Sequence, residues 1–213
     1  MKSNFPNAFI SLLTNGRRLS DFDLAKQVVA AKNKKLLFCI PLYADNDVQH
    51  DAIVGVPGAF ADTIQGIYNL YRLGRRMEVR VVVMRQNFTR LTAIAEFIYR
   101  NLPFVAHVAF MGMEYTGEAE EHLDDLWIDP QEYTQQLYEA VWHLHRRQMN
   151  VSIYNIPLCL LVEPMWQFSR DSISEWKKNY LEQCNSCTVK EKCGGVFGTS
   201  TVQSQNISSL TER

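Results

Sequence analysis

The run Val79-Arg80-Val81-Val82-Val83-Met84-Arg85-Gln86-Asn87 begins the part of the sequence that decides the fold. Its β-branched residues favour a buried strand, and the polar residues at its end predict where the strand stops. From Thr89 onward, apolar residues recur at the spacing of one helix face until Pro103 ends the helix. The next apolar run, Val105 to Met111, predicts a second strand. A strand, a helix and a strand in this order indicate a parallel unit with a right-handed crossover.

The same alternation extends over most of the chain. Apolar runs predict further strands at residues 8–13, 36–42 and 151–156, and helical spacing predicts helices at residues 20–33, 60–74, 130–144 and 172–182. The long polar segment 43–59 is interpreted as a functional loop. The sequence therefore predicts an α/β protein with a parallel sheet, whose functional side chains lie where the strands end.

Charge and hydrophobicity limit the partners of this chain. It has 22 basic and 23 acidic residues, for a formal net charge of -1, so we expect no nucleic-acid partner. No apolar run reaches the roughly 18 to 20 residues that a membrane helix needs, and the first residues do not resemble a secretory signal. We therefore expect no membrane partner and a cytoplasmic location, where thiols stay reduced.

Four of the five cysteines form a pattern that is typical of metal binding. Cys184-x-x-Cys187-x5-Cys193 is followed by Gly194-Gly195, and Cys159 comes just after the strand expected at 151–156. Thiolates are soft ligands, and zinc and iron-sulfur clusters both take four of them. The odd number of cysteines and the reducing compartment disfavour disulfides. The spacing leaves zinc and a cluster as alternatives, and the fifth cysteine, Cys39, is expected in the core.

Several segments, taken in order, resemble the later part of a radical S-adenosylmethionine (SAM) enzyme. They are Leu13-Thr14-Asn15-Gly16, the His50-Asp51 loop with Gly55-Val56-Pro57-Gly58-Ala59-Phe60, Met84-Arg85-Gln86-Asn87, and Tyr154-Asn155-Ile156-Pro157-Leu158-Cys159. The order and spacing carry the resemblance, which runs from about Ala8 to Ser200. More narrowly, the chain resembles the radical maturase of His-Xaa-Ser peptide-modification systems.

The resemblance implies a fold and a cofactor. The fold is a partial (β/α) barrel, incomplete because the first strands of the family are missing, with a cysteine-rich extension that binds a metal or cluster. Members of the family cleave SAM at a 4Fe-4S cluster held by a Cys-x3-Cys-x2-Cys loop, which this sequence lacks. We therefore do not expect this chain to cleave SAM alone, and whether it is an enzyme by itself stays open. SAM contacts, which need the missing half, are implied by position at Asn15, Arg85, Asn87, Gly112, Met113 and Glu114.

The resemblance also assigns the cysteines and the partners. Cys159, Cys184, Cys187 and Cys193 hold an auxiliary 4Fe-4S cluster that relays electrons or clamps the fold. The expected boundaries are a partial barrel at 1–160, the cysteine segment at 161–200 and a flexible tail at 201–213.

The expected partners are a small peptide or protein with His-Xaa-Ser repeats, and either the missing amino-terminal half or a second copy joined along the first strand. The alternative from the residues alone is a zinc-clamped module that binds a peptide or protein without redox chemistry.

Overall fold

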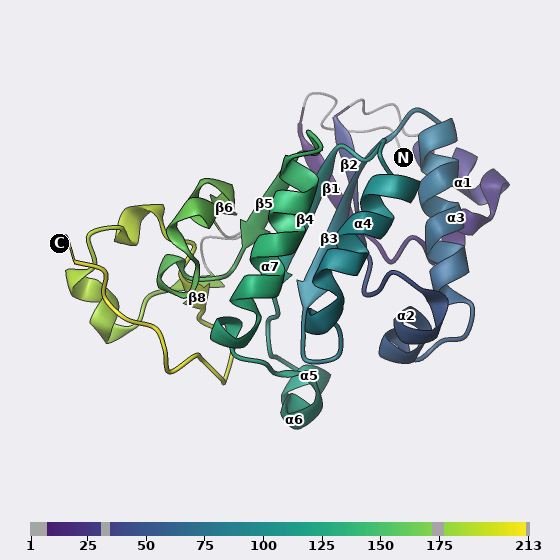
Figure 1. Ribbon diagram of the computed structural model, residues 1–213. Coiled ribbons are helices and arrows are strands. Elements are labelled where there is room, and N and C mark those ends of the chain that lie inside the picture. Colours follow the sequence, from purple (N-terminus) through teal and green to yellow (C-terminus); the bar gives the residue numbers. More distant parts are fainter. Residues whose placement is uncertain (1–7, 31–34, 172–176, 212–213) are drawn as a thin grey trace.

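A computed structural model describes residues 8–30, 35–171 and 177–211, and Figure 1 shows how their helices and strands are arranged. Six strands form one parallel sheet in the order of the sequence. They are β1 (Ile10–Leu13), β2 (Leu36–Pro41), β3 (Arg76–Val83), β4 (His107–Gly112), β5 (Val151–Tyr154) and β6 (Ser169–Arg170). The prediction of an α/β fold with a parallel sheet is confirmed, and the sheet is open rather than a closed barrel.

One face of the sheet is apolar and covered by helices. Ile40, Val79, Val108 and Val151 are paired in one row across β2 to β5, and each is buried. Because strand side chains alternate between faces, this row and its equivalents all point to the same side. The helices that pack there follow the strands in sequence, as Figure 1 shows for α4 and α7. They are α1 (Phe22–Val29), α3 (Ala59–Arg72), α4 (Leu91–Asn101) and α7 (Pro130–His145).

The opposite face of the sheet is polar. Cys39, Glu78 and His107 are paired in a row across β2, β3 and β4, one position away from the apolar row. Connecting helices do not cover this face, because parallel strands in sequential order place their crossovers on one side. The interior of a partial barrel has this arrangement, and the side chains of this face can therefore contribute to a site.

Two parts of the chain differ from the predicted elements. Residues 47–54 form helix α2 (Asp47–Val54) within the segment predicted as a loop, because Asn46 accepts a hydrogen bond from the amide of Gln49 and Gly55 ends the helix with φ 69°. The helix predicted at 172–182 lies partly outside the described residues. Its remainder contains β7 (Lys178–Asn179), which pairs with β8 (Val196–Phe197), so sheet pairing replaces the helix there.

The end of the chain is packed against the rest of the protein. Ser204 Oγ donates to both carboxylate oxygens of Asp129, at 2.9 and 2.8 Å, and Thr188 donates its amide and its hydroxyl to Leu210 O. The described part of the expected flexible tail, residues 201–211, therefore carries its own tertiary hydrogen bonds. In the described ranges, no helix has the length and apolar character needed to cross a membrane.

Candidate functional site

The four cysteines with metal-binding spacing meet around one cavity. Cys159 comes from the 3-10 helix η3 (Leu158–Leu160) after β5, Cys184 from η6 (Glu182–Ser186), Cys187 directly after η6, and Cys193 directly after η7 (Lys190–Lys192). All four line what we call the cysteine cavity, and none is in a disulfide. The remaining wall is largely apolar, with Leu158, Leu181, Val189, Val196 and Ile207. Segments that are distant in sequence thus present four free thiols to one enclosed space.

Backbone amides hold Cys193 in this wall. The amides of Leu158 and Gly195 donate to Cys193 Sγ at 3.3 and 3.4 Å. Tyr180 donates its hydroxyl to the carbonyl oxygens of Lys190 and Cys193, at 3.0 and 2.9 Å, and so fixes both ends of η7. Amides that point at a sulfur stabilise negative charge on it, which is what a thiolate ligand needs.

The thiols are electrostatically coupled. Burial raises the pKa of the Cys159 thiol, and the nearby sulfurs of Cys193 and Cys184 raise that pKa further. Among the described residues, no group of three or more His, Cys, Asp or Glu side chains is placed so that it could hold a metal ion. Four thiols are the donor chemistry of a soft centre.

Two larger cavities lie at the carboxyl ends of β1 to β4. The inner cavity, of about 440 Å³, opens on the polar face of the sheet and is bordered by Cys39, Arg80, Met111 and Phe197 among others. The outer cavity, of about 390 Å³, lies between the strand ends and α2. Of the residues expected to contact SAM, Asn15 lines both cavities, Gly112 and Glu114 line the inner one, and Met113 lines the outer one.

The other two expected SAM contacts, Arg85 and Asn87, line neither of these cavities. Arg85 is exposed and donates from Nε to Trp127 O at 2.9 Å. Asn87 is fully buried: its Oδ1 accepts from Met84 N, and its Nδ2 donates to Tyr43 O and Val82 O, all at 3.0 Å. In this conformation, both side chains hold loops together at the rim.

Glu114 connects the rim to the carboxyl-terminal segment. Its carboxylate accepts from Lys177 Nζ at 2.7 Å and from Thr199 Oγ1 at 2.6 Å. Burial opposes ionisation of Glu114, but these two hydrogen bonds outweigh it and lower its pKa. Glu114 is therefore a charged anchor beside the inner cavity.

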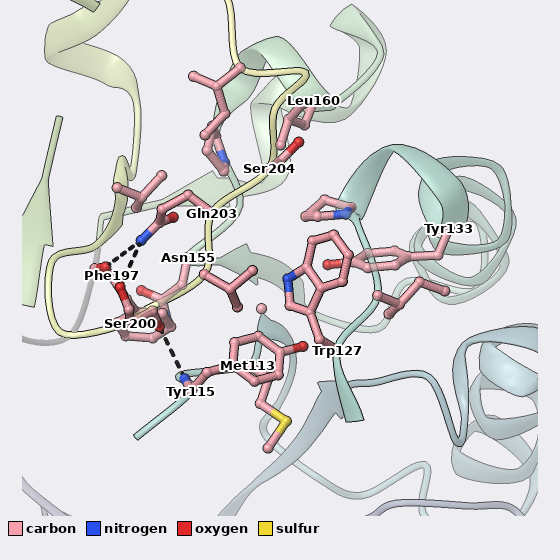
Figure 2. A pocket seen from close by; sticks show the side chains of 17 residues that line it. Met113, Tyr115, Trp127, Tyr133, Asn155, Leu160, Phe197, Ser200, Gln203 and Ser204 are labelled. Carbon is pink, nitrogen blue, oxygen red and sulfur yellow. Dashed lines mark hydrogen bonds between the residues drawn. The ribbon is translucent and has the colours of Figure 1, made fainter. Parts of the chain in front are cut away.

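A small aromatic cavity of about 50 Å³ separates the rim from the cysteines. Figure 2 shows Trp127 and Tyr133 on one side of it, facing Gln203 and Ser204 of the chain end. Tyr115 donates its amide to Ser200 Oγ at 3.0 Å, which closes this side of the cavity. Pro157, Val196 and Ile207 line both this cavity and the cysteine cavity, so the two share a wall.

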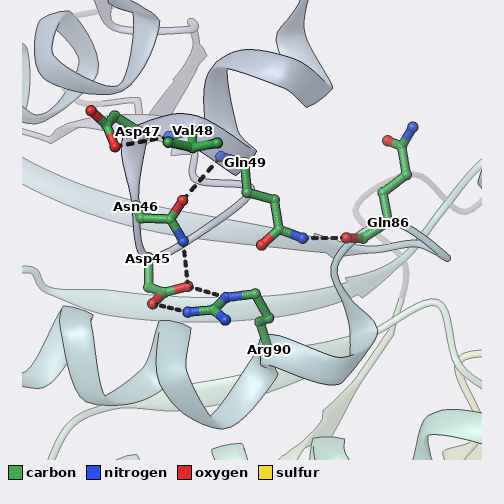
Figure 3. Close-up of polar contacts among 7 residues, drawn as sticks. All are labelled: Asp45, Asn46, Asp47, Val48, Gln49, Gln86 and Arg90. Atoms are coloured by element: carbon green, nitrogen blue, oxygen red, sulfur yellow. Dashed lines mark hydrogen bonds and ion pairs between the residues drawn. The ribbon is translucent and has the colours of Figure 1, made fainter.

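The wall of the outer cavity is fixed by polar contacts between loops, shown in Figure 3. Arg90 binds Asp45 through two hydrogen bonds, Nε to Oδ1 at 2.7 Å and Nη2 to Oδ2 at 2.6 Å. Gln49 of α2 donates to the carbonyl oxygen of Gln86. The loops after β2 and β3 are therefore joined, and α2 is held over the strand ends.

The sequence interpretation did not identify the polar network on the helix-free face. His107 contacts Glu78 Oε2 through Nδ1 at 2.8 Å and Ser152 Oγ through Nε2 at 3.0 Å, and Arg80 Nε lies 2.6 Å from Glu78 Oε1. The order Ser, His and Glu is that of a nucleophile with its base and orienting group. Ser152 is only 3% exposed and lines none of the four cavities above, so the network braces the sheet. The signal in the sequence was the charged pair Glu78 and Arg80 at alternate positions of a valine-rich strand.

No protein-family model matches the sequence, and no curated protein is similar to it. Two solved structures match part of this chain. Native anSMEcpe with bound AdoMet and Kp18Cys peptide matches with a TM-score of 0.51 and 15% identity, over 67% of this chain and 39% of that chain. SuiB from Streptococcus suis matches with a TM-score of 0.45 and 13% identity, over 67% of this chain and 31% of that one. The chain thus spans less than two fifths of either protein, and the first likeness establishes the fold alone.

Proposed function

We propose that this chain is the carboxyl-terminal part of a peptide-modifying radical SAM protein, and that Cys159, Cys184, Cys187 and Cys193 hold an auxiliary 4Fe-4S cluster. The observation that carries the proposal is the convergence of these four free thiols on one cavity. The fold it shares with an AdoMet-bound enzyme adds support.

We prefer a cluster to zinc because the sequence resembles that of radical SAM enzymes. A single zinc ion draws its sulfurs together, because each Zn–S bond is only about 2.3 Å long. A 4Fe-4S cluster spreads its irons over four corners, so its thiolates lie further apart. With four thiolates bound, the cluster has no open iron, and it would relay electrons or clamp the fold.

The expected cofactor and substrate follow from the same proposal. SAM would bind at the inner and outer cavities, where Asn15, Gly112, Met113 and Glu114 line the walls. The sequence has no Cys-x3-Cys-x2-Cys loop, so cleavage of SAM needs such a loop from another source. Because anSMEcpe was solved with a peptide, a small peptide or protein remains our proposed substrate, with His-Xaa-Ser repeats as its narrower form.

We propose that a polypeptide that supplies the Cys-x3-Cys-x2-Cys loop contacts this chain along the edge strand β1. β1 pairs only with β2 in the described sheet, and Phe9 and Leu13 beside its free edge are 80% and 64% exposed. An exposed apolar edge strand favours addition of another strand. We expect an amino-terminal piece or a second copy to pair there, and light scattering after gel filtration tests this. Association that Leu13→Lys weakens supports the contact, and a stable monomer without a partner contradicts it.

Production of the full chain without oxygen tests the cluster directly. We expect a brown protein with about four iron and about four sulfide per chain. Replacing any one of Cys159, Cys184, Cys187 or Cys193 by alanine should lower the iron content. Cys39→Ala is the matched control, since Cys39 is buried in β2 and does not line the cysteine cavity. A colourless protein with one zinc per chain, or iron that survives all four replacements, would overturn the proposal.

A further inference from the structure

Arg17 is a cation without a carboxylate partner at the wall of the outer cavity. Its Nε atom is buried and has no hydrogen-bond partner. Among the described residues, no Asp or Glu oxygen lies within 4.0 Å of its side-chain nitrogens. Asp21 and Asp62 border the space on the other side of Arg17 without reaching this distance. A buried donor of a charged group is costly to leave unpaired, so the position suits an anionic ligand.

The backbone places Arg17 at a fixed point. Arg17 begins the 3-10 helix η1 (Arg17–Ser20) directly after Gly16, which has φ 73°. Gly66 of α3 lies so close that an added Cβ atom would be 2.3 Å from Gly16 O, so only glycine allows this approach. Thr63 of α3 donates to Asn15 O at 3.4 Å on the other side of the same turn. The contacts of Gly66 and Thr63 with the turn before Arg17 therefore fix the backbone from which the Arg17 side chain extends.

The rest of the outer cavity combines neutral polar groups with apolar ones. No Asp or Glu is found among its described lining residues. Burial lowers the pKa of His50, and its Nδ1 accepts the amide of Tyr43 at 3.3 Å, so the ring is neutral with its proton on Nε2. Met84 and Met113 lie at the ends of β3 and β4, and the remaining apolar wall consists of Ile53 and Val54 of α2, with Pro41 and Leu126. The volume of about 390 Å³ is in the range of small-molecule sites.

We propose that the outer cavity binds a carboxylate carried on an apolar stem, with the Arg17 guanidinium as its charge partner. One guanidinium balances one negative charge, whereas a phosphate monoester would bring nearly two into a wall with no second cation. The carboxylate can belong to the methionine part of SAM or to a peptide. None of the four cysteines lines the outer cavity, so the carboxylate site does not depend on whether the cysteines bind a cluster.

Calorimetry with two matched probes tests the site. N-acetyl-L-methionine carries the carboxylate, and N-acetyl-L-methioninamide is its uncharged counterpart. With the full chain prepared without oxygen, we expect the acid to bind about tenfold more tightly than the amide, the effect of one charge-assisted hydrogen bond. Arg17→Gln should remove this preference. Arg18→Gln is the control, because Arg18 is exposed in the same 3-10 helix and does not line the outer cavity.

Each result has a defined meaning. Equal binding of the two probes, no binding of either, or a preference that survives in a folded Arg17→Gln variant overturns the site, with thermal melting as the check on folding. When the acid binds as expected, SAM is titrated as a competitor. Displacement of N-acetyl-L-methionine by SAM assigns the carboxylate to the cofactor, and failure to displace it assigns the carboxylate to a peptide. Iron content is measured on the same samples, so failure of the cluster is seen separately.

Discussion

The Nδ1 atom of His107 lies 2.8 Å from the Oε2 atom of Glu78, across two neighbouring strands on the helix-free face of the sheet. Arg80 Nε donates a hydrogen bond to Oε1 of Glu78, and Ser152 Oγ is hydrogen-bonded to Nε2 of His107. Every member of this network has a partner, which is the condition for a buried polar network to stabilise a fold. The charged side chains on the face of the sheet that borders the inner cavity are thus fixed by hydrogen bonds to one another.

Acid should destabilise the protein through Glu78. Burial opposes its ionisation, but hydrogen bonds from His107 and Arg80 outweigh burial and lower its pKa to about 2. A carboxylate with a lowered pKa contributes stability above its ordinary value of 4.5, and this contribution is lost as the pH falls toward 2. We expect a loss of about 3 kcal/mol in the free energy of unfolding over this range.

In Glu78→Gln this acid-dependent loss should be absent, while stability at neutral pH should be lower than in the wild type. Urea unfolding at several pH values measures both effects. Glu118→Gln, at an exposed position, is the control and should keep the wild-type profile. The same pH dependence in Glu78→Gln and in the wild type would show that Glu78 is not the group responsible.

Gly195 should be irreplaceable in the cysteine loop. Its φ is 65°, and an added Cβ atom would lie 2.6 Å from Asn179 O, in the β7–β8 pair. Gly55 has a similar φ of 69° but open space around it, so Gly55→Ala measures the backbone cost alone, about 1 kcal/mol. Gly195→Ala should lower the free energy of unfolding by clearly more. It should also lower the iron content, because the clash would displace the Gly195 amide, which donates to Cys193 Sγ. Equal losses of stability in the two variants would count against this account.

Ser204 should hold the end of the chain in place. Its hydroxyl bonds to both oxygens of Asp129, which also caps α7 by accepting the Gln131 amide. Ser204→Ala leaves the cap intact but removes a donor from a buried carboxylate, at a cost of about 1 to 3 kcal/mol. Amide hydrogen exchange in residues 202–210 should become faster. Ser209→Ala, which removes only an exposed contact with Ser186, should have little effect. Unchanged exchange in Ser204→Ala would show that other contacts hold the segment.

The sequence predicted the central sheet well because its signals are strong and local. β3, β4 and β5 overlap the predicted apolar runs within a few residues, and Asp129 with Pro130 starts α7 as expected. Helix α2 was missed because its apolar residues follow no helical period, so only Asn46 and Gly55 mark its ends. The strand β7 has two residues and depends on β8, a contact that no local pattern predicts.

The candidate site was predicted only in part, for a similar reason. The cysteine spacing identified four residues that line one cavity, because thiol ligands leave a recognisable pattern. Arg17 and His50 gave no such pattern, since their environment depends on the approach of α3 and α2 to the strand ends. Asn87, at which the resemblance implied a SAM contact, has a buried side chain that makes three hydrogen bonds.

Mössbauer spectroscopy of the full chain, produced without oxygen in medium enriched in iron-57, tests the central claim most directly. The account predicts one 4Fe-4S cluster per chain in the wild type and in Cys39→Ala, and its loss or conversion when Cys159, Cys184, Cys187 or Cys193 is replaced. Adding SAM should leave the spectrum unchanged, because four thiolates leave no iron open to it. A spectrum without a 4Fe-4S cluster in the wild type, or one that SAM alters, would contradict the claim.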